Sequence, residues 1–210
     1  MEFIQSFFDL VLHIDVHLAA FTQEYGVLAY AFLFLVVFCE TGLVVTPFLP
    51  GDSLLFAAGV AAGGGLLSFP LVVFLLLAAG IFGDATNFVI GRFVGPVIFK
   101  RETRFIKKQY LLTAHAFYER HGGKAILLAR FIPIVRTFAP FVAGIALMRP
   151  SAFLFYNCLG CAIWVVGLTS AGFFLGNLPW VKAHFSLIVY LIIAVSLLPI
   201  LIGWLRGKSA

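Results

Sequence analysis

Three stretches of this chain contain no Asp, Glu, Lys or Arg over lengths that a soluble fold rarely shows. They are residues 53–83, a run of 31, residues 150–181, a run of 32, and residues 183–205, a run of 23. A helix needs about 20 apolar residues to cross the hydrocarbon core of a bilayer. Hydrophobic residues make up 62% of the 210 residues and charged residues 11%, against about 45–50% and 25% in soluble domains. The sequence therefore predicts an all-α integral membrane protein with a single membrane domain.

Breaks within these runs decide which of them can form spanning helices. The triple glycine at 63–65 and Pro70 interrupt the run 53–83, so a helix is expected to begin only near Pro70. The two later runs each suit one spanning helix. The predicted transmembrane helices are residues 70–96, 150–178 and 183–205.

Two further segments are too short for simple spans, and we predict that they form re-entrant hairpins. In residues 30–62 the apolar sequence is stopped by Pro47 and Gly51, which leaves a second arm of about half the hydrocarbon thickness. Residues 122–148 repeat this plan, with a break at Pro133. Irregular backbone at membrane depth is tolerated where protein covers it or where it lines a wet cavity.

Each half of the chain thus contains a hairpin followed by a helix. Residues 55–59 (LFAAG) resemble residues 140–144 (PFVAG), and residues 91–95 (GRFVG) resemble residues 172–176 (GFFLG). Internal repeats with broken helices are common among secondary transporters. We expect an inverted repeat of re-entrant hairpin plus transmembrane helix, completed by an N-terminal interfacial helix and a C-terminal transmembrane helix.

Loop charges predict the orientation of these segments. The stretch from Arg92 to Lys124 contains eight Lys or Arg and two Glu, so the basic loop 97–121 is expected in the cytoplasm, together with the C-terminus. The N-terminal segment 1–29 carries four acidic residues and no Lys or Arg. Its polar residues recur at helical spacing, which predicts an amphipathic helix at the interface; these are Gln5, Asp9, His13 and His17.

Four charged residues lie in or beside the predicted hairpins: Glu40 and Asp52 in the first, Arg130 and Arg136 in the second. A charge at membrane depth costs about 2.5–3.5 kcal/mol on insertion scales, so these residues are expected to be paired or to serve transport. Two structural alternatives remain open. Asp52 can cap the second arm of its hairpin, and Glu40 can form an ion pair with Arg130.

The chemistry of these side chains suits a phosphate-bearing ligand. Two guanidinium groups, here Arg130 and Arg136, can bind a phosphate bidentately and stay charged. Carboxylates in a desolvated site can instead gain and lose protons during transport. Asp84 and Asn87 are candidates for extending this polar path, although Asp84 can also satisfy local backbone groups.

Several of these residues belong to sequence motifs that resemble the DedA family, also called the SNARE-associated or VTT-domain family. The first signature is FCETG at 38–42 with PFLPGDS at 47–53. The second is GGK at 122–124, ARFIPIVRT at 129–137 and AG at 143–144. The likeness extends over nearly the whole chain.

The resemblance implies two opposed re-entrant hairpins and transport of a lipid across a bacterial inner membrane. The expected partners are a phosphate-bearing lipid such as undecaprenyl phosphate, held by Arg130 and Arg136, and protons, coupled through Glu40 and Asp52. Flipping or scrambling of other phospholipids stays open, as does the oligomeric state, a homodimer included. No cofactor or metal is expected.

Other functional classes have weaker support in the sequence. A phosphatase of the PAP2 type would need a Ser-Gly-His triplet and a CDP-alcohol transferase would need clustered aspartates, and the sequence contains neither. We therefore expect no enzymatic activity. An ion/proton antiporter would use the same acids, but two arginines disfavour a cation path. The basic residues lie in short loops without a known nucleic-acid-binding module, so a nucleic-acid partner is not expected.

Overall fold

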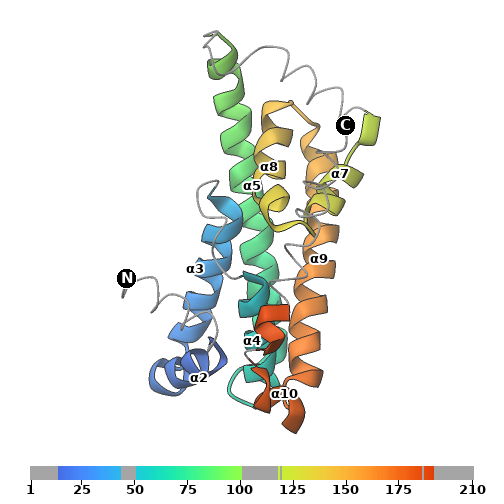
Figure 1. Ribbon diagram of the computed structural model, residues 1–210. Helices are drawn as coiled ribbons and strands as arrows, with labels where there is room; N and C mark the ends of the chain where they lie inside the picture. The colour runs from blue at the N-terminus through green and yellow to red at the C-terminus, as the bar shows by residue number, and fades with distance from the viewer. Residues whose placement is uncertain (1–13, 44–50, 101–117, 119, 186, 192–210) are drawn as a thin grey trace, which may run out of the picture. The chain divides into compact units, whose positions relative to one another are not determined.

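The computed structural model describes residues 14–43, 51–100, 118, 120–185 and 187–191. Regular structure within these ranges is entirely helical (Figure 1), as predicted. The predicted N-terminal stripe up to His13, the turn of the first hairpin, most of the basic loop and the last part of the third predicted span lie outside the described residues. The helices are α2 (Ile14–Tyr25), α3 (Leu28–Gly42), α4 (Gly51–Gly63), α5 (Phe69–Lys100), α7 (Lys124–Ala129), α8 (Pro133–Ile145), α9 (Pro150–Leu175) and α10 (Pro179–Ala183).

Within the described part of the chain, two helices are long and apolar enough to cross a membrane. They are the Phe69–Gly95 portion of α5 and the whole of α9, which cover the first two predicted spans. The apolar helices α3, α4 and α8 have only 15, 13 and 13 residues. The short arms expected from the Pro and Gly breaks are therefore helical.

The chain divides into two compact units that each combine segments from both of its halves. Unit 1 contains residues 1–37, 49–78 and 164–210, and unit 2 contains residues 38–48 and 79–163. Helices α3, α5 and α9 contribute to both units. The two packing units therefore do not coincide with the two halves of the sequence, each of which was expected to form a hairpin followed by a helix.

In unit 1, α4 crosses the end of α9 through glycines. A Cβ atom added to Gly59 would overlap the carbonyl oxygen of Thr169, and one added to Gly172 would overlap that of Phe56. One turn further on, a Cβ on Gly176 would overlap the side chain of Val60. The two backbones approach so closely because these positions carry no side chain.

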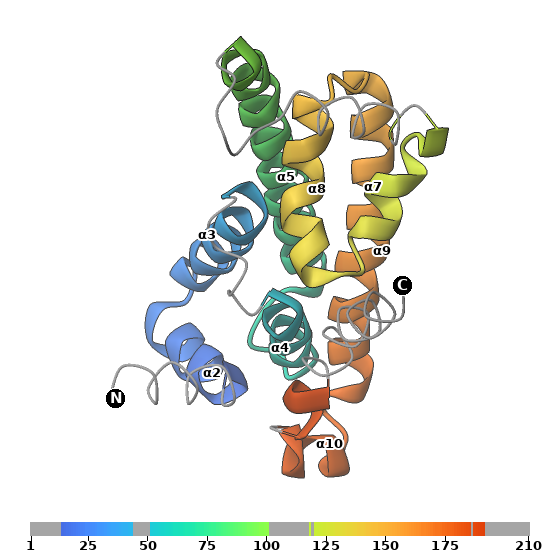
Figure 2. The same ribbon diagram turned by 45° about the horizontal axis from the view of Figure 1, so that its top comes forward.

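Unit 2 contains the same crossing, formed by α8 and α5, which lie side by side in Figures 1 and 2. A Cβ atom added to Gly144 would overlap the carbonyl oxygen of Phe88, and one added to Gly91 would overlap that of Phe141. The LFAAG and PFVAG motifs, matched in the sequence, thus each pack on one of the two matched GxxxG-spaced motifs. Sequence similarity and packing agree on an internal repeat.

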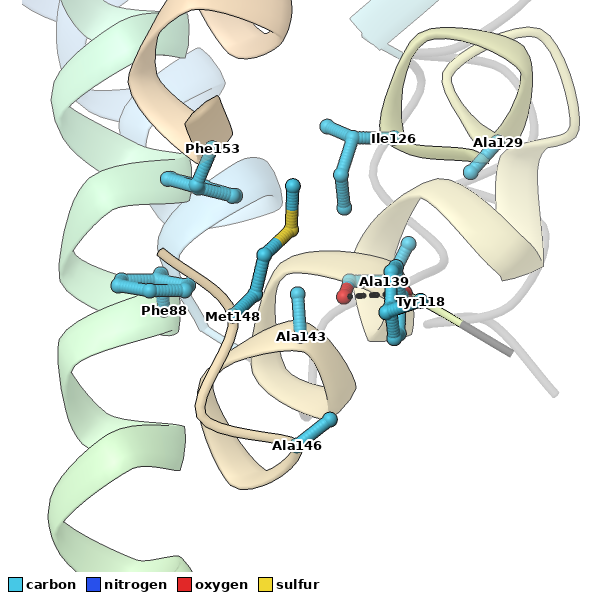
Figure 3. Close-up of a cluster of buried hydrophobic side chains, with 9 residues drawn as sticks. All are labelled: Phe88, Tyr118, Ile126, Ala129, Ala139, Ala143, Ala146, Met148 and Phe153. Carbon is cyan, nitrogen blue, oxygen red and sulfur yellow. Dashed lines mark hydrogen bonds between the residues drawn. The ribbon is translucent and has the colours of Figure 1, made fainter. Parts of the chain in front are cut away.

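A buried cluster of apolar side chains completes unit 2 (Figure 3). The rings of Phe88 and Phe153 stack with centroids 4.2 Å apart. The hydroxyl of Tyr118 donates a hydrogen bond to the carbonyl oxygen of Ala139 at 3.1 Å, which ties the segment before α7 to α8. This cluster packs α7 and α8 against α5 and α9 and so positions the charged residues near the turn between α7 and α8.

Candidate functional site

The first ion pair of unit 2 joins Glu40 near the end of α3 to Arg136 in the first turns of α8. Arg136 Nη2 donates to Glu40 Oε1 at 2.6 Å, and the two side chains are 8% and 2% exposed. Pro133 occupies the first turn of α8, where its missing N–H costs nothing. The helix therefore starts three residues before Arg136 and holds the guanidinium near the turn between α7 and α8.

The second ion pair joins Arg130, at the C-cap of α7, to Asp84 in the middle of α5. Arg130 Nη1 donates to Asp84 Oδ2, and both side chains are about 95% buried. The same Nη1 also donates to Asn157 Oδ1 at 2.9 Å. Asn157 in turn donates to the carbonyl oxygen of Ile81 at 3.3 Å, so an amide on α9 links the guanidinium to α5.

Asn87 connects the backbones that carry the first pair. Its Nδ2 donates to the carbonyl oxygen of Thr41 at 3.2 Å and to that of Thr137 at 2.8 Å. Thr41 directly follows Glu40, and Thr137 directly follows Arg136. The fully buried Asn87 side chain thereby fixes α3 and α8 at the positions where their charges meet.

Glycines allow α3 to approach α5 at this level. A Cβ atom on Gly42 would lie 3.2 Å from the Cα atom of Gly83, and one on Gly83 would overlap Thr41 Oγ1. Gly42 lies two residues after Glu40, and Gly83 directly precedes Asp84. This contact between the backbones of α3 and α5 therefore places the segments that carry Glu40 and Asp84 side by side in unit 2.

Two buried ion pairs contribute little net free energy to the packing of these helices. Desolvating two charges costs several kcal/mol per ion, and apolar side chains of similar volume often stabilise as well or better. The neutral amide of Asn157, which accepts a hydrogen bond from Arg130, reduces this cost without removing it. Buried pairs of this kind in a membrane protein therefore point to function.

Unit 1 has apolar residues at the positions that correspond to Asp84 and Asn157. Gly172 lies 81 positions after Gly91 in the sequence, and the two glycines occupy equivalent places in the repeated crossing. Moving 81 positions forward from Asp84 on α5 gives Val165 on α9, and moving 81 positions back from Asn157 on α9 gives Leu76 on α5. Val165 and Leu76 are fully buried. The second ion pair is thus specific to one copy of the repeat.

Asp52 lies in unit 1, in the first turn of α4, and is partly buried. Its Oδ1 accepts a hydrogen bond from Trp164 Nε1 at 2.7 Å. The indole N–H gives this carboxylate a side-chain partner. A helix-capping role in the first turn of α4 stays a prediction beside it. Its role in proton coupling stays a prediction.

The partners of the arginines differ from those considered in the sequence. Glu40 pairs with Arg136 and not with Arg130, because Arg130 lies at the end of α7 and is held by Asp84. Asp84 consequently does more than satisfy local backbone groups. Asn157 was not among the predicted site residues, although an amide inside a 26-residue apolar helix is a usable signal. Within the described part of the chain, Cys39, Cys158 and Cys161 form no disulfide.

Comparisons with known proteins agree with the sequence motifs. The VTT domain matches residues 49–174. The chain is 51% identical to Protein DedA of Escherichia coli, over 100% of this chain and 97% of that protein. It is 45% identical to an uncharacterized membrane protein of Mycobacterium tuberculosis, over 85% and 79%, and 35% identical to the inner membrane protein YqjA of E. coli, over 71% and 69%. No solved structure matches the chain.

Proposed function

Since this chain belongs to the VTT-domain (DedA) family of membrane proteins, and since unit 2 buries two arginine–carboxylate pairs, we propose that it transports a phosphate-bearing lipid across the membrane. The buried pairs are the observation that supports this proposal. Arg130 and Arg136 bind the headgroup phosphate, while the apolar tail remains in the surrounding lipid. Undecaprenyl phosphate is the candidate substrate that the family resemblance suggests.

Exchange of partners on the arginines provides the mechanism. A guanidinium group binds carboxylate and phosphate oxygens with the same planar geometry. Glu40 and Asp84 therefore occupy the arginines when no lipid is bound, and phosphate replaces a carboxylate when it arrives. A displaced carboxylate that takes up a proton leaves no unpaired charge in the apolar unit. Lipid binding and proton uptake are coupled in this way.

The remaining polar residues have supporting roles in this proposal. Asn87 holds Glu40 and Arg136 in register by bonding the residue after each of them. Asp52, bonded to Trp164 in unit 1, is a second site of proton uptake. The protein acts as a transporter and catalyses no covalent chemistry.

The same proposal includes location and orientation. The protein is a multi-pass protein of the bacterial inner membrane with its C-terminus in the cytoplasm, because the basic residues between Arg92 and Lys124 favour that side. The two hairpins enter from opposite faces of the bilayer. Such an arrangement would bring a broken helix from each repeat to membrane depth, as in other transporters built from inverted repeats.

The proposal is tested by lipid translocation in proteoliposomes that contain the full-length protein. Labelled undecaprenyl phosphate, phosphatidylglycerol and phosphatidylcholine are compared, with and without a pH gradient. Arg136→Gln is expected to abolish transport of the substrate lipid. Arg120→Gln, at an exposed arginine outside the ion pairs, is the matched control and is expected to transport normally.

Each outcome of this experiment has a definite reading. Equal transport of all three lipids, independent of pH, would identify a scramblase. Proton movement without any lipid movement would identify an ion antiporter. Undiminished lipid transport by Arg136→Gln would reject the role of the arginine in headgroup binding.

A further inference from the structure

A cavity of about 440 Å³ lies in unit 2, away from the ion pairs, at the end where α8 stops and α9 begins. It falls within the range of roughly 300–1,000 Å³ that is usual for small-ligand sites. Its lining comes from the segment before α7, from the α8–α9 turn and from the first turn of α9. The lining residues are Tyr118, Gly122, Gly123, Ala146, Leu147, Met148, Arg149 and Ala152.

The wall of this cavity is pre-formed by the buried cluster of unit 2. The cluster includes three residues of the cavity wall, Tyr118, Ala146 and Met148. Figure 3 shows the Met148 side chain directed into the cluster. Burial raises the pKa of Tyr118 to about 12, so its hydroxyl stays neutral. These contacts leave little freedom for the cavity to collapse.

The turn that carries Arg149 is fixed by its own hydrogen bonds. At the end of α8, the N–H of Leu147 donates to the carbonyl oxygen of Gly144 and that of Met148 to the carbonyl oxygen of Ala143, at 3.0 Å each. This pattern is a Schellman motif, and Leu147 occupies its left-handed position with φ 55°. The backbone is thus held in a costly conformation that presents Arg149 at the cavity.

Among the described residues that line the cavity, the charged side chain is that of Arg149. The chain from Tyr118 to Arg149 contains five Lys or Arg and one acidic residue, Glu119. Two of these five are the arginines of the buried ion pairs, whereas Arg149 is exposed and lines the cavity. Arg92 also donates to the carbonyl oxygen of a lining residue, Met148, at 3.2 Å. The first turn of α9 adds the partial positive charge of a helix N-terminus.

Apolar surface adjoins this positive cavity. Leu147, which lines the cavity, and Phe155, three positions after the lining residue Ala152 and so on the same face of α9, are about half exposed or more. An inorganic anion would leave this surface unused, whereas an amphiphile would cover both parts. We propose that the cavity binds the phosphate headgroup of a lipid at the membrane boundary, with Arg149 as its ligand and the alkyl chain along Leu147 and α9.

This site is separate from the Arg130 and Arg136 pairs, and its occupancy is measured as binding without transport. Dodecyl phosphate is titrated into the detergent-solubilised full-length protein, and inorganic phosphate is titrated in parallel. Arg149→Gln is expected to weaken dodecyl phosphate binding about tenfold, the loss of one charge-assisted contact. Arg120→Gln removes the same charge from a residue that does not line the cavity, and it should change the affinity less than twofold.

A second variant, Ala152→Leu, tests the cavity independently in case Arg149→Gln fails to fold. Ala152→Leu fills the cavity and keeps every charge, so it should also weaken binding while the melting temperature stays near that of the parent protein. The double variant Glu40→Gln/Arg136→Gln, which leaves no unpaired buried charge, should retain binding at the cavity. Equal losses in Arg149→Gln and Arg120→Gln would reduce the effect to surface charge and overturn the proposal. Equal affinity for inorganic phosphate would reject the lipid, and loss of all binding in a folded double variant would assign the probe to the ion pairs.

Discussion

Glu40 and Arg136 are separated by 96 positions in the sequence, yet their side chains form a buried ion pair at 2.6 Å. Neither helix that carries them is long enough to cross a bilayer alone. Each residue lies next to a threonine whose carbonyl oxygen is held by Asn87. The pair thus lies where α3 and α8 meet. Variants of the pair and variants of Asn87 can therefore be compared in both stability and transport.

Arg136→Gln is expected to destabilise the protein by about 3–5 kcal/mol, because it leaves the Glu40 carboxylate buried without its cation. The double variant Glu40→Gln/Arg136→Gln should recover most of this loss, since no charge remains. Reversible unfolding by SDS titration measures both. Transport should stay abolished in the double variant, because the phosphate has lost its ligand. A double variant no more stable than the single one would contradict this account.

Asn87→Leu should lower stability by about 1–3 kcal/mol, because it removes two buried hydrogen bonds to backbone carbonyls. Thr86→Val is the matched control, since the exposed Thr86 hydroxyl bonds only to Phe82 within its own helix at 2.8 Å. Crosslinking of introduced cysteines, Glu40→Cys with Arg136→Cys in a Cys39→Ala background, by a bifunctional thiol reagent of fixed length reports the register of α3 and α8. Unchanged crosslinking in the Asn87→Leu background would show that the amide does not position the pair.

Gly91→Ala and Gly172→Ala should both destabilise the protein, because a Cβ atom at either position overlaps a carbonyl oxygen of the crossing helix. A loss of about 2 kcal/mol or more is expected, as for overpacked cores. Gly167→Ala is the control on α9, where a Cβ atom has open space, and it should be neutral or stabilising by up to about 1 kcal/mol. Similar losses in the two crossing variants would support the equivalence of the repeats. A stable Gly172→Ala protein would argue against it.

Asp52→Asn separates hydrogen bonding from proton coupling at the start of α4. The amide oxygen can still accept the hydrogen bond of Trp164, so stability should change by less than about 1 kcal/mol. If Asp52 takes up a proton during transport, the dependence of the transport rate on pH should flatten in this variant. Trp164→Phe, which removes the donor and keeps the carboxylate, should leave a transport rate that still depends on pH. An unaltered profile in Asp52→Asn would limit Asp52 to a structural role.

Local sequence patterns were sufficient for the broad class of the fold and for the charged candidates. Long apolar runs predicted α5 and α9, because about 20 consecutive apolar residues match the thickness of the hydrocarbon core. The motifs around Gly59 and Gly144 predicted a repeat. The same reasoning selected Glu40, Arg130 and Arg136, since a charge in an apolar segment is costly wherever it lies.

The partners of those charges depended on tertiary structure. Glycines at 42 and 83 bring α3 onto α5, and the start of α8 at Pro133 sets the direction of Arg136. These contacts decide that Arg136 meets Glu40 and that Asp84 takes Arg130. The sequence by itself determined which residues are too polar for their surroundings. Only the packing of helices distant in the chain decided which of them neutralise one another, because Coulomb and hydrogen-bond energies depend on distances that local sequence does not specify.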